Sequence, residues 1–447
     1  MTLIMIKSCR KLKVHRRAYS FSMGQKSFLV TSVVIFVSSV LQLLTSNFAK
    51  AQDQLTNYLN IAAENNPQLQ ALFTEYLATL EEMPQAKALP DPQLMFSAFL
   101  QPIETRVGPQ RASLSFSQMF PWFGTLTARE DVVAQQAEAK LQMLEDAKQE
   151  LFKQVKVTYN ELYYLQAATN ITRRNLKLLA SFKELARVNF EGGQVGFADV
   201  LRIEIEEEGL QNKLQYLEES YEPLITQFEQ LLNQNLTEAI VLPDSLWMEE
   251  LLLTKDSVFQ IILANNPQLE AIRYQAQSFQ SQVVAVQKMS LPSFTLGGSY
   301  INIGFHTDME VPDNGRDAIL FPQIGVRLPL YRKKYEAREK QAQLQEEALL
   351  LQRESIQDQL LTQLENLYRD YRDAQRRVRL NRRLADLAER TLNLLQTEFM
   401  TNEADFEEII RAEQQLLEYQ LNYERAKVER NNHVYSIQYL MGKSYEK

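Results

Sequence analysis

The sequence predicts a mainly α-helical protein made of two tandem repeats, each with a pair of short β-strands and a hairpin of very long helices. Three observations predict this fold class. A five-residue motif occurs twice, 200 residues apart. Gly and Pro are missing from two long stretches, and apolar and polar residues alternate in four short segments.

The N-terminal segment has the order of an export signal. A basic stretch up to Lys26 precedes an uncharged, largely apolar run over 27–49, and Ala49-Lys50-Ala51 follows as a small-x-small cleavage site. We predict that residues 1–51 are a signal peptide and that Gln52 begins the mature chain; Met23 is an alternative start. An uncleaved membrane anchor is the alternative interpretation, because the run is long enough to span a bilayer.

The composition of the remaining chain excludes several classes of protein. Residues 52–447 hold 40 basic and 56 acidic residues, a net charge of −16, which disfavours binding to nucleic acid. The single cysteine, Cys9, lies in the predicted signal, so the mature chain has no disulfide and no thiolate metal site. No later apolar stretch reaches the length of a membrane helix, so insertion into a membrane would require a barrel.

The repeat is visible in two motifs. Asn65-Asn66-Pro67-Gln68-Leu69 recurs over residues 265–269, and a Phe-x6-Phe pattern at Phe190 recurs at Phe399. A period of about 200 residues indicates a duplicated domain rather than a solenoid. We predict a first repeat over 52–243, with strands in about 92–120 and a helical hairpin over about 125–233. The second repeat is predicted over 244–447, with strands in about 293–330 and a hairpin over about 334–441.

The hairpins are predicted to be unusually long. No Gly or Pro occurs between Thr125 and Glu191 or between Leu330 and Met441, and these residues are the main helix breakers. An outgoing helix of 65 residues would be roughly 97 Å long. Apolar residues step by four and three from Leu360 to Phe399, interrupted by Asn381, which indicates coiled-coil packing.

The short segments between the helices alternate with period two. In 112–120, Leu and Phe alternate with Ser, and 323–328 alternates likewise, with partners near 92–100 and 293–304. A small soluble sheet is one interpretation. Membrane strands are the other, but four strands cannot close in lipid, where an open edge is not tolerated. Three chains would supply twelve strands, enough for a barrel.

These residues together resemble the TolC-like outer-membrane efflux protein family. The resemblance rests on the repeat, the duplicated Asn-Asn-Pro-Gln-Leu motif, the Leu89–Pro92 segment and the turn from Phe190 to Leu201. It implies a homotrimer with a shared twelve-strand barrel in the cell outer membrane and a helical tunnel extending into the periplasm. Leu89–Pro92 with Gln118–Gly124 is most similar to the CusC and CzcC type, the heavy-metal efflux branch.

The same resemblance implies a passive channel. Its role would be the exit duct of a tripartite efflux or type I secretion system, with no cofactor and no enzymatic activity. Its partners would be a periplasmic adaptor, an inner-membrane RND or ABC transporter and outer-membrane lipid. The cargo, whether metal ions, drugs or proteins, cannot be read from the sequence.

The periplasmic entrance is expected where the long helices turn back, at Glu191–Gly196 and Met400–Asp405. Glycines in the first turn suit a reversal that needs positive φ, and Asn402 stands in the second. The resemblance implies that Glu408 occupies the position of an acidic ring that narrows the pore and attracts cations, and that Glu407 assists it. Asp199 occupies the position of the family's acidic residue in the first turn. The alternative is ion-paired or solvated charges, since acids are favoured at helix starts anyway. The predicted turn glycines are Gly192, Gly193 and Gly196, and the predicted gate includes Arg202 and Arg411, the latter at a position where the family often has another acid.

Three other classes of protein fit the sequence less well: an enzyme, a periplasmic adaptor and a structural coiled-coil protein. The mature chain's histidines, His306 and His433, have no partner at metal-ligand spacing, and no nucleophile or phosphate-binding motif occurs. A periplasmic adaptor would carry one hairpin, whereas this chain has two in tandem. A structural coiled-coil protein would leave the strand pairs at matching places in both halves unexplained.

Overall fold

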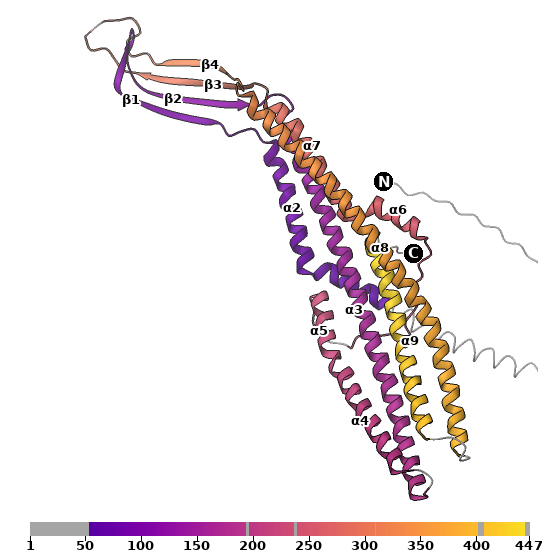
Figure 1. Cartoon of the computed structure of the whole chain (residues 1–447). Coiled ribbons are helices and arrows are strands. Elements are labelled where there is room, and N and C mark those ends of the chain that lie inside the picture. Colours follow the sequence, from indigo (N-terminus) through magenta and orange to yellow (C-terminus); the bar gives the residue numbers. More distant parts are fainter. Residues whose placement is uncertain (1–52, 194–195, 237–238, 309, 401–405, 443–447) are drawn as a thin grey trace, which may run out of the picture. The chain divides into compact units, whose positions relative to one another are not determined.

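The computed structural model describes residues 53–193, 196–236, 239–308, 310–400 and 406–442 of the chain. The predicted signal peptide and its cleavage site lie outside these residues. A helix over residues 53–65 comes first. It is followed by α2 (Pro67–Lys87), β1 (Gln93–Thr105), β2 (Gly108–Phe120), α3 (Thr125–Glu191), α4 (Phe197–Glu219), α5 (Tyr221–Leu232), α6 (Lys255–Asn265), α7 (Pro267–Met289), β3 (Ser293–Ile303), β4 (Ala318–Arg327), α8 (Arg332–Met400) and α9 (Phe406–Leu440) (Figure 1).

The order of elements is the same in the two halves of the chain. Each half has a short helix, a second helix, a strand pair, a very long helix and a returning helical segment. The predicted fold class, mainly helical with four strands, is therefore confirmed. The predicted boundary between repeats falls in the segment that joins α5 to α6, and it stays a prediction.

The duplicated motif is a helix start. Asn66 Oδ1 accepts hydrogen bonds from the backbone N–H groups of Gln68 and Leu69, at 3.0 and 3.2 Å. Asn266 Oδ1 accepts the equivalent bonds at 3.1 and 3.2 Å. Proline follows each asparagine at the first helical position, where its missing N–H costs nothing. The motif therefore ends one helix and begins the next.

The long helices have the predicted extent. α3 has 67 residues and α8 has 69, each roughly 100 Å long. The returning segments differ, because α9 is one helix whereas α4 and α5 are separated at Ser220. Pro223 explains the break, since it lacks the N–H that a continuous helix would use.

The predicted coiled-coil stripe on α8 is largely buried against its neighbours. Leu364 and Ala374 have no exposed surface, and the interrupting Asn381 is also buried. Its main neighbours are α9 and α7, while α3 packs against α2, α7 and α9. Burial of the stripe confirms the packing predicted from the steps of four and three. No described helix has an apolar stretch long enough to cross a membrane.

The four strands form one antiparallel sheet in the order β1-β2-β3-β4. Leu94 pairs with Phe116, which pairs with Gly298, and Phe294 pairs with Val326, so these residues share one face. Ser115 and Ser117 lie on the opposite face, since successive residues of a strand alternate. The sheet thus has an apolar face, on which Leu94 is 70% exposed, and a polar face rich in serine.

The segment that joins α5 to α6 is held in place by hydrogen bonds from tyrosine hydroxyl groups and an asparagine amide to its backbone carbonyls. Tyr159 Oη donates to the carbonyl of Val241 at 2.8 Å, and Tyr368, 209 residues later, donates to Leu253 at 2.7 Å. Asn431 on α9 is fully buried and donates through Nδ2 to the carbonyl of Trp247 at 2.7 Å. These contacts hold the segment against α3, α8 and α9.

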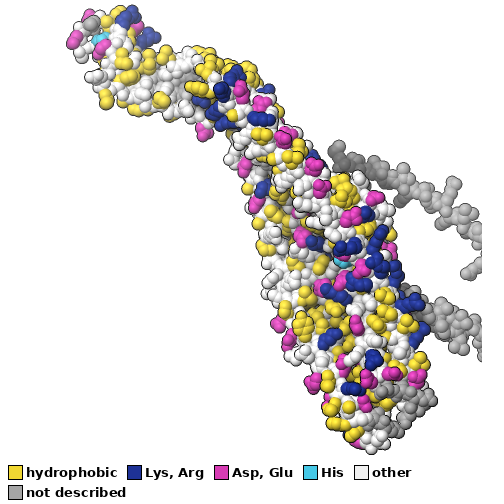
Figure 2. Space-filling model, viewed as in Figure 1, with side chains coloured by type: hydrophobic (Ala, Val, Ile, Leu, Met, Phe, Trp, Pro, Cys, Tyr) yellow, Lys and Arg dark blue, Asp and Glu magenta, His cyan; other side chains and the backbone are white. Residues whose placement is uncertain are grey.

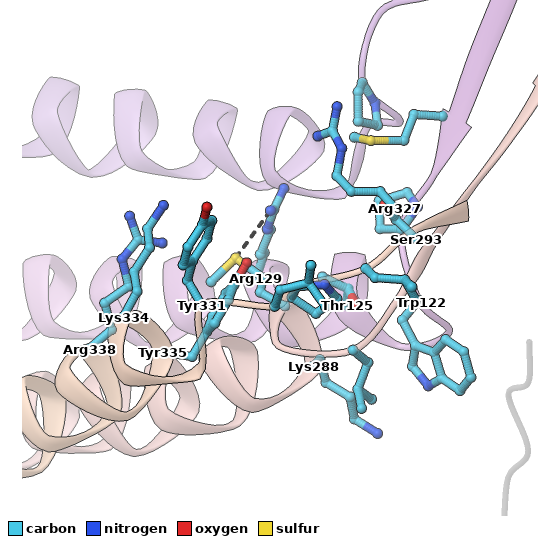
Figure 3. A pocket seen from close by; sticks show the side chains of 18 residues that line it. Trp122, Thr125, Arg129, Lys288, Ser293, Arg327, Tyr331, Lys334, Tyr335 and Arg338 are labelled. Carbon is cyan, nitrogen blue, oxygen red and sulfur yellow. Dashed lines mark hydrogen bonds between the residues drawn. The ribbon is translucent and has the colours of Figure 1, made fainter. Parts of the chain in front are cut away.

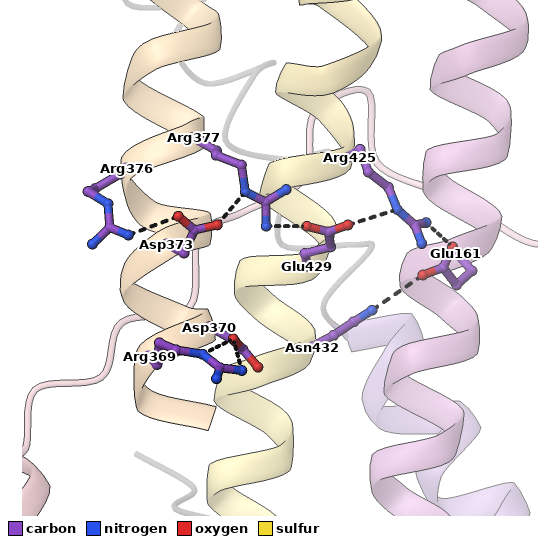
Figure 4. Close-up of polar contacts among 9 residues, drawn as sticks. All are labelled: Glu161, Arg369, Asp370, Asp373, Arg376, Arg377, Arg425, Glu429 and Asn432. Atoms are coloured by element: carbon purple, nitrogen blue, oxygen red, sulfur yellow. Dashed lines mark hydrogen bonds and ion pairs between the residues drawn. The ribbon is translucent and has the colours of Figure 1, made fainter. Parts of the chain in front are cut away.

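A chain of ion pairs joins α3, α9 and α8 at mid-length (Figure 4). Arg425 binds Glu161 at 2.5 Å and Glu429 at 3.2 Å. Glu429 in turn binds Arg377 at 2.6 Å, and Arg377 binds Asp373 at 2.8 Å. Charges alternate along this chain, so Glu429 and Asp373 each lie between two arginines, and the three helices are linked in register.

Candidate functional site: the hairpin tip

The hairpin tip comprises the ends of α3 and α8 and the starts of α4 and α9. A hydrophobic cluster drawn from all four helices lies beneath it. The repeated Phe-x6-Phe motif forms a ring pair across each turn, with centroids 5.5 Å apart for Phe190 and Phe197 and 5.3 Å apart for Phe399 and Phe406. The second pair is buried, whereas Phe190 and Phe197 are 42% and 56% exposed.

The first turn is built by glycines with different backbone conformations. Gly193 has φ +72°, as predicted for a tight reversal. Gly192 has φ −78° and Gly196 has φ −81°, so the expectation of positive φ is wrong for these two. Gly196 instead precedes α4 in extended backbone, and its N–H donates to Asp199 Oδ2 at 3.1 Å. Asp199 is therefore a capping residue at the start of α4.

Four of the predicted gate residues form one chain of ion pairs between the two repeats. Arg202 Nη1 lies 3.4 Å from Asp199 Oδ1 and 2.9 Å from Glu407 Oε2. Glu407 Oε1 accepts from Arg411 Nη2 at 3.0 Å, one helical turn along α9. The structure thus brings together Asp199, Arg202, Glu407 and Arg411. Their side chains are partly exposed, so the chain of ion pairs contributes little stability and can open.

The remaining predicted residues are placed apart from this chain. Glu408 is exposed at the start of α9 and forms no ion pair with a described residue. Asn402 lies outside the described residues. Among the residues that the structure describes, no three His, Cys, Asp or Glu side chains are grouped so as to hold a metal ion.

Glu413, two turns into α9, is a feature of the tip that the sequence did not reveal. Its side chain is fully buried, and neither carboxyl oxygen has a hydrogen-bond partner in the described structure. Burial, assisted by the nearby Glu206 carboxylate, raises the pKa of Glu413 to about 7. Glu206 itself accepts a hydrogen bond from Gln414 at 2.7 Å. At neutral pH the Glu413 carboxyl therefore lies near its titration midpoint.

Glu413 is the repeat equivalent of Glu204, at the same spacing of 209 residues that separates Phe190 from Phe399, but the two carboxyl groups lie in different environments. Glu204 is partly exposed and pairs with Lys183 at 3.2 Å. One signal in the sequence could have indicated that Glu413 is buried. It lies on the face of α9 that also carries Ala412, Leu416 and Leu417, and these residues are buried. The carboxylate that lies near Glu413, however, is Glu206 on α4, which belongs to the other repeat.

Together, these features define a class of protein: one with two antiparallel helical hairpins, a charged tip where they reverse, and an amphipathic sheet at the opposite ends of the long helices (Figure 1). Residues 58–233, less than half of the chain, match the family model described as outer membrane efflux protein. The family resemblance drawn from the sequence is thereby confirmed. A comparison with curated protein sequences gives no match.

Solved structures extend the likeness to most of the chain. The outer-membrane channel OprN superimposes with a TM-score of 0.72 and 17% identity, over 88% of this chain and 90% of that one. The outer membrane protein VceC from Vibrio cholerae gives 0.69 and 18%, over 89% and 98% of the two chains. CusC, described as a transmembrane channel, gives 0.70 and 13%, over 88% and 92%. The chain therefore has the fold of these channels.

Proposed function

We propose that this protein is the outer-membrane exit channel of a tripartite efflux or type I secretion system, located in the cell outer membrane and extending into the periplasm. In this role three copies form a homotrimer with a twelve-strand barrel and a helical tunnel. The observation that supports this proposal most strongly is the four-stranded sheet, which has one apolar face. Its edge strands, β1 and β4, each pair with one described strand only.

The dimensions of the sheet support this role. The strands have 10 to 13 residues, the length that a tilted strand needs to cross a bilayer. Ile324 and Phe96 on the apolar face are 74% and 70% exposed, which is costly in water and favourable in lipid. Edge strands with unpaired backbone groups must be closed inside a membrane, and two further copies would close them.

The helical hairpins would carry the passage across the periplasm. Cargo would enter at the hairpin tip from a periplasmic adaptor and an inner-membrane RND or ABC transporter, and would leave through the barrel. The channel carries out no chemistry and needs no cofactor. Assignment to the heavy-metal branch stays a prediction from Leu89–Pro92 and Gln118–Gly124, because OprN, VceC and CusC superimpose with similar TM-scores.

The hairpin tip would act as the entrance gate. The Arg202–Glu407 pair joins α4 of one repeat to α9 of the other, so it restrains the position of the two returning helices. Because this pair is exposed, a partner that docks on the tip could exchange it at low cost. Glu408 would supply the charge that faces the opening, repeated three times in the trimer.

The deciding experiment is extraction of the protein from outer membranes in detergent, followed by mass determination and conductance measurement in planar bilayers. A trimer that forms discrete channels is expected. A water-soluble monomer without conductance would contradict the channel and would favour the adaptor or structural coiled-coil interpretation.

The gate makes a prediction for Glu408. Glu408→Gln is expected to lower the K⁺/Cl⁻ permeability ratio roughly twofold, because three carboxylates are removed from a narrow opening. The ratio is measured from the reversal potential of single channels in a KCl gradient. Glu418→Gln is the matched control, since Glu418 is an exposed acid farther along the same helix. Equal ratios in wild type and Glu408→Gln would remove Glu408 from the gate.

A further inference from the structure

A cavity of about 320 Å³ lies where the sheet joins the helices (Figure 3). Its walls come from the ends of β2 and β4, the start of β3, the starts of α3 and α8 and the end of α7. It is far along the chain from the hairpin tip, since α3 begins here and reverses 67 residues later. We call it the basic cavity because of the side chains that line it.

Five basic residues and no acidic residue line the basic cavity: Arg129, Lys288, Arg327, Lys334 and Arg338. Not one of the five forms a salt bridge with a carboxylate of the described residues. Arg129 Nη2 has the thioether sulfur of Met289 as its polar contact, at 3.2 Å. Like charges gathered in a hollow repel one another, and an anion would relieve that repulsion. Figure 2 shows Lys and Arg side chains gathered on the surface at this junction.

Two helix starts add to the positive potential. α3 and α8 both begin at the basic cavity, and neither has an acidic residue in its first turn. The N-terminus of a helix carries a partial positive charge, so basic residues there are unfavourable unless an anion is bound. Thr125, the first residue of α3, is 2% exposed, and its hydroxyl has no hydrogen-bond partner in the part of the chain that the structure describes. It lines the cavity, where that hydroxyl could donate to a ligand.

The basic cavity opens on the polar face of the sheet. Ser117 pairs with Gly297 and Met119 with Thr295, while Ser293 pairs with Arg327, so these residues lie on the serine-rich face. Figure 3 shows Arg129, Arg327, Tyr331, Lys334 and Arg338 on one side of the ribbon, and Trp122 and Lys288 on the other. Trp122 stacks on Phe294, a residue of the apolar face, at 5.8 Å.

We propose that the basic cavity is a binding site for organic anions on their way through the channel, and that anionic compounds are a class of cargo. This inference rests on the proposed function, because only in a barrel must the polar face of the sheet point inward. Lys288 lies on the other side of the ribbon, so each chain would direct four cations toward the interior. Three copies would then place a ring of twelve cations at the base of the barrel.

The lining indicates which anions fit. Guanidinium groups bind carboxylate, phosphate and sulfonate in a two-pronged manner, and Arg327 and Arg338 supply two of them. Tyr331 and Tyr335 offer aromatic surface beside the cations, and Leu328 and Leu330 offer apolar surface. An aromatic or amphiphilic anion matches this combination. A bare metal cation would be repelled by these side chains, so this cavity would not bind it.

The test uses pyranine, a pyrene that carries three sulfonates, as a blocker of single channels. In the cavity variant, Arg327→Gln, Lys334→Gln and Arg338→Gln are combined. The concentration of pyranine that blocks half of the current is expected to be at least about tenfold higher for this variant than for wild type. Loss of a single charge-assisted contact costs about a factor of ten, so tenfold is the minimum for three substitutions. The matched control combines Arg332→Gln, Lys333→Gln and Lys340→Gln, three exposed cations of α8 outside the cavity, and should shift less than about threefold.

A second measurement separates this inference from the proposed function. Pyranine binding to the detergent-extracted protein is followed by fluorescence anisotropy, which needs no conductance. Channels whose block and binding are equal in wild type and the cavity variant would overturn the anion site and leave the channel intact. Absence of conductance, with binding that depends on the three cavity residues, would overturn the channel and keep the anion site. Trimer mass confirms that both variants fold and assemble.

Discussion

Replacing Glu413 with Gln is expected to stabilise the hairpin tip by up to about 3 kcal/mol at pH 8 and to leave it nearly unchanged at pH 4. The reason is the pKa of the buried carboxyl, which is raised from 4.5 to about 7 in the folded protein. The difference between folded and unfolded pKa values corresponds to about 3 kcal/mol of stability. Gln keeps the size of the protonated acid but cannot ionise.

The direction of this pH dependence follows from the two pKa values. Below pH 4.5 both states hold the proton, and Glu413 adds no pH-dependent cost. Between pH 4.5 and about 7 only the unfolded state releases it, so the free energy of unfolding falls as the pH rises. Above about pH 7 the folded protein carries a buried carboxylate next to Glu206, and the cost is complete.

Hydrogen exchange of peptides from α4 and α9, corrected for the intrinsic pH dependence of exchange, measures this effect locally. Protection of wild type is expected to fall by about two orders of magnitude between pH 5 and pH 8, and protection of Glu413→Gln should stay nearly constant. Glu204→Gln is the control, because Glu204 holds the equivalent repeat position but is partly exposed and paired with Lys183. The same pH dependence in wild type and Glu413→Gln would contradict the assignment.

A second large effect is expected at Asn266. Asn266→Ala should lower the free energy of unfolding by about 3 kcal/mol, whereas Asn66→Ala should cost about 1 kcal/mol. Both substitutions remove the cap of a helix. Asn266 is 2% exposed, and its Nδ2 also donates to the carbonyl of Leu440 at 2.9 Å, where α9 ends. The equivalent bond of Asn66 to Leu231 is 3.5 Å long and less buried.

The comparison is made with the thermal midpoints of the detergent-extracted protein and its variants. Asn266→Ser separates the two contributions, because serine keeps a capping oxygen and lacks the amide donor to Leu440. Its loss of stability is expected to lie between wild type and Asn266→Ala. Equal losses for Asn66→Ala and Asn266→Ala would show that the buried contact to α9 contributes nothing beyond the cap.

The elements of the fold were predictable because their signals are local. Absence of Gly and Pro permits a long helix whatever it packs against, and the alternation in 112–120 selects one face of a strand whatever pairs with it. The four strands, the long helices and the coiled-coil stripe on α8 were therefore found close to their observed bounds. The break between α4 and α5 was missed although Pro223 is visible in the sequence.

The candidate site was predictable only as a set of residues near two turns. That Arg202 binds Glu407 across the repeats depends on the packing of α4 and α9, and spacing within either turn does not encode it. Positive φ at Gly193 but not at Gly192 or Gly196 depends on how the chain enters α4. The basic cavity collects residues from six elements, so no single stretch of sequence marks it.

The sequence by itself determined the tandem repeat, the helix and strand periods and the family resemblance, because these depend on residues close together in the chain. Only the tertiary structure decided which of two equivalent residues is buried. Glu204 and Glu413, Asn66 and Asn266, and the two Phe pairs occupy matching positions in the repeats, yet one member of each lies deeper than the other. The physical reason is that desolvation depends on the helices packed around a side chain, and in this fold those helices come from both repeats.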